Sequence, residues 1–387
     1  MAVRVDPSFL GELERIGAFD IRGCFNCGNC TAVCSLSQGE DSFPRRLIRY
    51  AQLGMRDRLA ASKEIWLCYY CGDCSETCPR KAEPGEFMAS ARRYFISSWD
   101  FTTLARRLYT SWWFTALFMG ILAVLFAGML LASGGKMTSS RLELFDFIPL
   151  AWVHNLGTVV LFLAGFAAAA NVMNAAWRLN RSLPTKSPDK SSSLKDAWGS
   201  ARKTLKELAA QTRFAECANE GLAKEPWYLS VRWIHLAIMW GFLGLFAATA
   251  IDFFFKVPGS SVPLWYPARL LGMASGVLLL YGTTVAMVRR LSPAGGSPFV
   301  HSLLSDWLLL GLLWSVALTG FLLEIAVYRP AASPWEYAAF LVHVVLAMEM
   351  LILLPFTKFM HMFYRPLALW ILNLRSMREQ QAPDRQG

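Results

Sequence analysis

Eight of the nine cysteines stand in two runs near the start of the chain, and both runs have the spacing CxxCxxCxxxC. Thiolates at this spacing bind 4Fe-4S clusters, because three cysteines of a run converge on one cluster and the fourth reaches a second cluster nearby. We therefore predict two clusters with crossed ligation. The predicted ligands are Cys24, Cys27, Cys30 and Cys78 for cluster 1, and Cys34, Cys68, Cys71 and Cys74 for cluster 2.

Zinc sites and disulfide scaffolds also use clustered cysteines. Zinc takes four ligands in a closed tetrahedron, and it does not favour three closely spaced cysteines followed by a fourth. The first twenty residues carry charges where a cleavable signal peptide would have an apolar stretch. We therefore expect the N-terminus to stay in the cytoplasm, where the reducing environment makes disulfides rare. Iron-sulfur clusters are the favoured interpretation.

The segment between the two cysteine runs is too long for a minimal bacterial ferredoxin. Its apolar residues Leu47, Tyr50, Leu53 and Leu59 follow a helical spacing. We therefore predict an α-helical ferredoxin domain over residues 1–105.

Residues 15–100 resemble the C subunit of heterodisulfide reductase. The residues that carry this resemblance are Pro44, Gly54, the sequence IWLC that ends at Cys68, and the closing Cys78, Pro79 and Arg80. The chain departs from the pattern at Ser35, where many such motifs have proline, so the last turn of the first motif is expected to differ in shape.

The rest of the chain is too apolar for a soluble protein, with 55% hydrophobic and 17% charged residues overall. A helix of about 20 mostly apolar residues crosses a membrane. Six segments meet this requirement, at 111–132, 148–177, 229–255, 265–288, 302–328 and 335–360. The fold class we predict is all-α, with the ferredoxin domain followed by a six-helix transmembrane cytochrome b bundle over 106–365 and a cytoplasmic tail over 366–387.

The net charge of +10 does not indicate a nucleic-acid partner, because chains with long apolar runs carry Lys and Arg in cytoplasmic loops. The basic loop 178–228 and Arg289 and Arg290 mark the cytoplasmic side. We expect a multi-pass protein of the cytoplasmic membrane with both termini inside. Within the loop, an amphipathic helix with Leu194, Trp198, Leu205 and Leu208 near one face is predicted to lie on the membrane or a partner, although a solvated tether is almost as good an explanation.

Histidines inside a membrane are functional candidates, although a hydrogen-bonded packing role is the simpler alternative. His343 and His361 are 18 residues apart, which is about five helical turns or about 27 Å. By depth, we pair His235 with His361 as ligands of an inner haem b near the cytoplasm, and His154 with His343 as ligands of an outer haem b. His301 competes for the inner site, or serves a quinone pocket or a helix cap.

Several charged residues in or near the spans are weaker candidates. Arg232 and Arg269 stand near span ends, where a guanidinium suits a haem propionate but is also an ordinary interfacial anchor. Asp306 and Glu349 lie in apolar spans and have the acid–base chemistry that quinone redox requires. Cys217 stands alone in the basic loop, where we expect it to be a small packing residue.

The histidine pattern resembles the cytochrome b subunit of respiratory nitrate reductase, whose last helix carries two histidines 18 apart. In that family an earlier helix carries two more, ten apart, whereas this chain has Leu245 ten residues after His235. Because of this departure, we predict the second ligand of the outer haem on a different helix, at His154.

Across nearly its whole length, the chain resembles the C subunit of the quinone-interacting membrane-bound oxidoreductase complex of sulfate reducers. This resemblance implies an electron-transfer subunit of an oxidoreductase, with menaquinone as substrate, two flavin and iron-sulfur subunits as partners, and electron exchange with adenylylsulfate reductase. One alternative is a membrane subunit of another heterodisulfide-reductase-like complex. A second, of a different class, is a non-catalytic membrane anchor or redox sensor.

Overall fold

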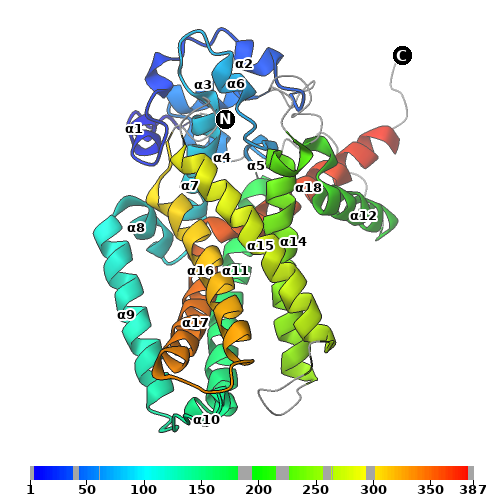
Figure 1. Cartoon of the computed structure of the whole chain (residues 1–387). Helices are drawn as coiled ribbons and strands as arrows, with labels where there is room; N and C mark the ends of the chain where they lie inside the picture. The colour runs from blue at the N-terminus through cyan, green and yellow to red at the C-terminus, as the bar shows by residue number, and fades with distance from the viewer. Residues whose placement is uncertain are drawn as a thin grey trace.

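The computed structural model describes residues 4–37, 43–60, 62–181, 194–214, 226–255, 263, 265–292 and 301–381. All regular secondary structure in these residues is helical, which confirms the predicted all-α class. A bundle of short helices caps one end of a set of long helices, and the long helices run away from it (Figure 1). Cys217 lies outside the described residues.

The N-terminal domain consists of short helices around one apolar core. Gly54 follows α3 with a φ of +66°, and a Cβ there would lie 2.3 Å from the backbone oxygen of Asp6. The predicted helical segment between the cysteine runs is therefore divided, because only glycine fits this turn. The helices are α1 Phe9–Glu14, η1 Ile21–Gly23, α2 Asn29–Ala32, α3 Arg45–Gln52, α4 Arg56–Ala60, α5 Glu64–Leu67, α6 Asp73–Glu76 and α7 Pro84–Trp99.

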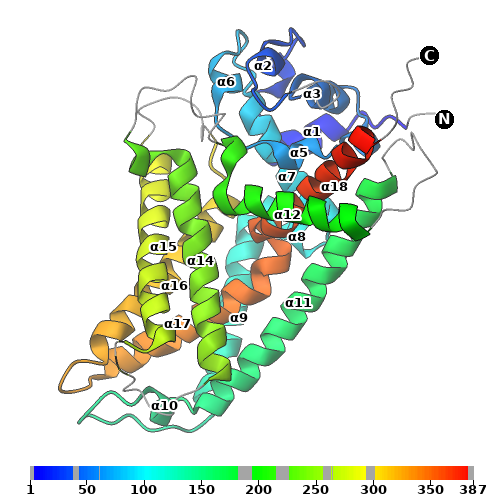
Figure 2. The same ribbon diagram turned by 90° about the vertical axis from the view of Figure 1, so that its right-hand side faces the viewer.

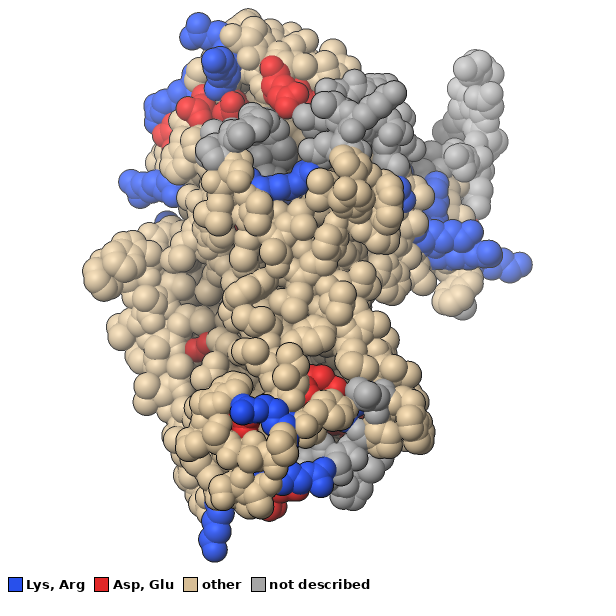
Figure 3. Space-filling view, viewed as in Figure 1, with Lys and Arg blue, Asp and Glu red and all other residues tan. Residues whose placement is uncertain are grey.

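Six helices are long and apolar enough to cross a membrane, as predicted. Charged residues gather at the two ends of the molecule, and the band between them is almost uncharged on the face in Figure 3. Short helices α8 Leu104–Thr110 and α10 Leu144–Phe147 flank the first span. The long helices are α9 Trp112–Leu131, α11 Leu150–Arg181, α14 Val231–Phe254, α15 Pro267–Leu291, α16 Leu304–Ala326 and α17 Pro334–Leu353, with η3 Trp227–Leu229 before α14.

Small residues bring α14 and α15 into close contact. A Cβ on Gly241 of α14 would lie 2.7 Å from the backbone nitrogen of Leu279 of α15, so no larger residue fits without moving the helices apart. This is the packing expected between membrane helices, where small residues let backbones approach. The tight pair fixes the helix that carries His235.

The sixth span differs from the single helix predicted over 335–360. Helix α17 ends at Leu353, and two 3₁₀ turns, η4 Leu354–Phe356 and η5 Lys358–Met360, precede α18 His361–Gln381. Pro355 lacks a backbone N–H, and Thr357 has an extended backbone with φ −123° and ψ −174°. His343 and His361 are therefore not on one continuous helix, and the 18-residue periodicity does not set their relative directions.

The basic loop contains the predicted helix, α12 Leu194–Ala210. Its buried side differs from the predicted apolar face, because Ser200, Thr204 and Glu207 are buried while Trp198 and Leu205 are exposed. Ser200 donates to the Trp370 carbonyl of α18. Figure 2 shows α12 lying between the ferredoxin domain and the long helices. The buried face of α12 can be polar because its side chains form hydrogen bonds with α18 at this junction.

A buried ion-pair network joins the two domains. Asp306, at the start of α16, accepts from Arg93 of α7 at 2.7 Å and from Lys358 of η5 at 2.7 Å. The side chain of Asp306 is fully buried, so its charge depends for compensation on these two cations and on Arg290, which lies 3.9 Å away. Removing one partner of such a buried pair is strongly destabilising. The ferredoxin domain is thus fixed directly to the membrane helices.

Candidate electron-transfer site

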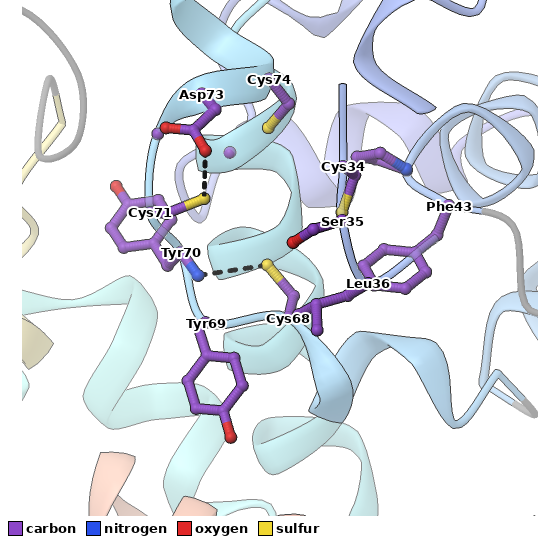
Figure 4. Close-up of a pocket in the computed structure, with 13 residues that line it drawn as sticks. Cys34, Ser35, Leu36, Phe43, Cys68, Tyr69, Tyr70, Cys71, Asp73 and Cys74 are labelled. Atoms are coloured by element: carbon purple, nitrogen blue, oxygen red, sulfur yellow. Dashed lines mark hydrogen bonds between the residues drawn. The ribbon is translucent and has the colours of Figure 1, made fainter. Parts of the chain in front are cut away.

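The structure brings the four predicted cluster 2 ligands to one pocket. Cys34, Cys68, Cys71 and Cys74 all line it, and their sulfur atoms face its interior (Figure 4). Cys68 follows α5, and Cys71 and Cys74 lie on either side of Gly72, whose φ of +103° turns the chain into α6. Cys34 comes from the other run, so the arrangement has the crossed form that the spacing predicts.

Backbone amides support the cluster 2 thiols. The Tyr70 N–H donates to Cys68 Sγ at 3.3 Å. Burial raises the pKa of the Cys34 thiol to about 12, although the amides of Leu36 and Ser37 oppose the rise. A metal ligand must be a thiolate, so these buried thiols need the positive charge of iron to deprotonate.

The remaining four cysteines form the second group. Burial raises the pKa of the Cys30 thiol to about 11, and the neighbouring Cys24, Cys27 and Cys78 thiols add to this rise. Cys78 therefore lies among the three cysteines of the first run. The Ala82 N–H donates to Cys78 Sγ at 3.4 Å. Cys27 is exposed, which places this group at the surface.

Among the described residues, no group of three or more His, Cys, Asp or Glu side chains is close enough to hold one metal ion. The preference for 4Fe-4S clusters over zinc rests on the spacing of the two cysteine runs in the sequence.

The histidine pair predicted for the inner haem is also brought together. The rings of His235 and His361 have their centres 6.3 Å apart. Two imidazoles that bind one metal from opposite sides, each at about 2 Å, have ring centres about 6 Å apart. The separation of the two rings would therefore suit a haem iron held between them.

Hydrogen bonds hold both rings by the same nitrogen. His361 Nδ1 lies 2.5 Å from the Lys358 carbonyl oxygen. His235 Nδ1 lies 2.7 Å from Gln211 Nε2. Such outer contacts fix the tautomer and leave Nε2 for the metal. His361 therefore keeps Nε2 available as an iron ligand, and His235 does so when Gln211 presents its amide oxygen to Nδ1.

Gln211 is a site residue that the sequence analysis missed. It follows α12 with a φ of +49°, and it is buried, with no hydrogen-bond partner for Oε1 among the described residues. Rotating the amide by half a turn, which exchanges its nitrogen and oxygen, lets Oε1 accept from His235 Nδ1–H. In the sequence, the only signal for Gln211 is its position at the end of an amphipathic helix.

The two outer-haem candidates have different surroundings. His343 Nδ1 lies 2.9 Å from Thr319 Oγ1, and a Cβ on Gly320 would stand 3.3 Å from the His343 ring. The His154 ring lies 4.8 Å from the ring of Phe253 on α14. The pairing of His154 with His343 stays a prediction.

The structure places His301 at the domain junction. Its Nε2 lies 2.9 Å from Asp20 Oδ2, and its ring meets the Phe19 ring edge-on at 4.9 Å. Both contacts are with the ferredoxin domain. This position favours a role in joining the domains over the predicted haem or quinone role.

The four weaker candidates have different surroundings in the structure. Arg232 donates to the Ala210 carbonyl at 2.6 Å, and Arg269 pairs with Glu324 at 2.8 Å. Asp306 belongs to the ion-pair network at the domain junction. Glu349 is buried in α17 and its Oε1 has no hydrogen-bond partner among the described residues. Of these four, Glu349 keeps the features expected of a proton-transfer group.

Comparison with known proteins supports the N-terminal part of this site. Residues 20–82 match the family described as a 4Fe-4S dicluster domain. This match confirms the predicted iron-sulfur domain. The segment contains every cysteine of the two groups.

Several named proteins are similar to about a quarter of the chain. A protein of Archaeoglobus profundus, named as similar to the C subunit of heterodisulfide reductase, is 33% identical over 94 residues, which are 24% of this chain and 50% of that protein. The C subunit of the H(2):CoB-CoM heterodisulfide,ferredoxin reductase of Methanothermobacter thermautotrophicus is 31% identical over 88 residues, 23% of this chain and 48% of that protein. The predicted resemblance to the heterodisulfide reductase family is confirmed.

The similarity is limited in extent. The chain spans about half the length of the relatives named above. No solved structure matches it significantly. The similarities support a role in electron transfer as part of an oxidoreductase, and they concern the ferredoxin domain.

Proposed function

We propose that this chain is a membrane subunit that carries electrons between menaquinol and cytoplasmic flavin and iron-sulfur partner subunits. Residues 1–105 would hold the two 4Fe-4S clusters, and residues 106–365 one or two haems b. The observation that carries the proposal is the 6.3 Å separation of the His235 and His361 ring centres beside the ferredoxin domain. When bound, the haem iron and the clusters supply one-electron chemistry.

The order of the sites supports a route through the molecule. His361 begins α18, which contacts α5 of the ferredoxin domain, and His235 lies near the start of α14. Arg365, four residues after His361, donates to the Cys68 carbonyl at 3.1 Å, so the histidine helix contacts the cluster 2 loop directly. Cluster 1 comes next, and its exposed Cys27 stands where a soluble partner has access. The sites therefore run from the membrane side to the surface.

Quinone redox requires proton transfer as well. Oxidation of menaquinol to menaquinone releases two electrons and two protons, and the protons need an acceptor. Glu349 is the acceptor we propose, because it is a buried carboxylate whose Oε1 has no hydrogen-bond partner among the described residues, so it can take up a proton at little cost. His154 and His343 would hold a second, outer haem in this scheme.

The protein partners in the proposal come from resemblance. The quinone-interacting membrane-bound oxidoreductase complex implies two flavin and iron-sulfur subunits and electron exchange with adenylylsulfate reductase. The named relatives, which are C subunits of heterodisulfide reductases, favour a second candidate, a membrane subunit of a heterodisulfide-reductase-like complex. Both place the chain in the cytoplasmic membrane, with the ferredoxin domain and both termini inside.

The test is a haem and iron count on the purified full chain and its histidine variants. We expect His235→Ala and His361→Ala each to lose the same haem b while the iron and sulfide of the clusters stay unchanged. His301→Ala, at the domain junction, is the control and should keep all haem. Unchanged haem in both ligand variants would refute the inner site, and absence of haem from the wild type would favour the anchor alternative.

A menaquinol analogue added to the same preparations tests the direction of the route. We expect the haem of the wild-type protein to be reduced, and the clusters after it. Cluster reduction should be lost in His361→Ala. Equal cluster reduction with and without the histidine would show that electrons do not need this site.

A further inference from the structure

Two guanidinium groups meet at one carbonyl between the histidine pair and cluster 2. Arg92 of α7 donates through its NH2 group to the Cys68 carbonyl, and through Nε to the Ile65 carbonyl at 2.9 Å. Arg365 of α18 donates to the same Cys68 carbonyl at 3.1 Å. The positively charged side chains of Arg92 and Arg365 therefore lie side by side and share one uncharged carbonyl as hydrogen-bond acceptor.

Neither guanidinium contacts a carboxylate within the part of the chain that the structure describes. The nearby acid Glu207 accepts from Tyr69 and Thr212 and from the Arg213 N–H. Burial lowers the pKa of Arg92, the neighbouring Cys68 thiol opposes this shift, and the positive charge of Arg365 adds to it. Like charges brought together in a partly buried place cost free energy unless an anion compensates them.

The two arginines lie close enough to the histidine pair to act on both rings. Arg365 lies one helical turn after His361 on α18. Arg92, Arg365 and Lys358 are the cations that act electrostatically on both the His235 and the His361 rings. Lys358 already pairs with Asp306, so Arg92 and Arg365 are the cations of this group that have no carboxylate partner among the described residues.

We propose that Arg92 and Arg365 form an anion site for the carboxylates of the macrocycle that His235 and His361 hold. This inference rests on the proposed inner haem. Haem b carries two propionates, and a guanidinium binds a carboxylate through two parallel N–H donors. The predicted propionate partner near this site was Arg232, which instead donates to the Ala210 carbonyl.

The site has a consequence for cluster 2. The two guanidiniums that take the carboxylates also hold the carbonyl of Cys68, a predicted cluster ligand. The Arg365 guanidinium further lies 3.7 Å from the centre of the Tyr69 ring. Loading of the anion site and the shape of the cluster 2 loop are therefore linked through the same two side chains.

The experiment compares haem b with its dimethyl ester, which lacks both carboxylates. The full chain is produced without haem but with its clusters, and its affinity for each compound is measured by Soret titration. We expect the wild type to bind haem b at least about tenfold more tightly, because a hydrogen bond to a charged group contributes about 1.5 kcal/mol or more. In Arg92→Gln and Arg365→Gln, this ratio should fall toward one.

Arg232→Gln is the matched control and should keep the wild-type ratio. Equal binding of the acid and the ester by the wild type, with binding still dependent on His235, would overturn the anion site and leave the inner haem intact. The anion site would also be overturned if the preference for haem b over its dimethyl ester were lost in Arg232→Gln but kept in Arg92→Gln and Arg365→Gln. Loss of cluster 2 in the arginine variants with an unchanged ratio would show that they only shape the Cys68 loop.

Discussion

Replacing Gln211 tests whether the residue that holds His235 also tunes the inner haem. In Gln211→Leu, His235 Nδ1 loses its 2.7 Å contact, because a shorter apolar side chain replaces the amide. Loss of an outer contact of this kind costs about 10–100-fold in metal affinity, or about 1.4–2.8 kcal/mol. We therefore expect haem affinity to fall by that factor in the titration of the haem-free chain.

The reduction potential gives the sign of the effect. A hydrogen bond that takes the Nδ1 proton makes the imidazole a stronger donor to iron. Its loss in Gln211→Leu should raise the potential, because the ferric state is then less stabilised. Gln211→Glu, which places a stronger acceptor at the same position, should lower it. Optical redox titration of the haem band measures both shifts.

The control is Met239→Leu, because Met239 Sδ also lies near Gln211 Nε2, at 3.8 Å, but makes no contact with His235 Nδ1 among the described residues. It should keep both affinity and potential. A shift of the same sign in Gln211→Leu and Gln211→Glu would refute the reasoning, since packing damage rather than the hydrogen bond would then explain it.

Crossed ligation, the domain junction and the quinone chemistry can each be tested by one substitution. Cys78→Ser should give the same residual paramagnetic spectrum as Cys27→Ser, whereas ligation within each run predicts a match to Cys71→Ser. Asp306→Asn leaves the buried Arg93 and the partly exposed Lys358 without their carboxylate partner, which should cost up to about 3–5 kcal/mol and lower the temperature at which the purified protein unfolds. Glu349→Gln should slow oxidation of a menaquinol analogue while haem and iron contents stay constant; an unchanged rate would contradict its role as proton acceptor.

The parts of the fold that depend on local spacing were predictable from the sequence. The six spans were found because length and apolarity alone decide whether a helix can cross a membrane. The two cysteine groups could be predicted because each short run places three cysteines close together along the chain. The same pattern predicts a crossed fourth ligand, and the structure brings Cys34 to the pocket of the second run.

The parts that depend on contacts between distant segments were not predictable. Arg92 and Arg365 are far apart in the chain, and nothing in either local sequence marks the carbonyl on which they meet. The break after Leu353 was missed because Pro355 was interpreted as part of a continuous apolar run. Hydropathy measures how apolar a segment is, and it does not record where the backbone hydrogen bonds end.

Helix α12 shows how the cytoplasmic loop takes part in the site. Its end supplies Gln211 to His235, and its last turn supplies Glu207 to the hydroxyl of Tyr69, which follows Cys68. The same tyrosine ring stacks on Phe214 at 4.7 Å. A solvated tether would have no reason to bury Glu207 and Gln211, since burying polar side chains is costly unless their contacts compensate. Because these contacts reach the histidine pair and the cluster 2 loop together, α12 fixes the position of each site relative to the other.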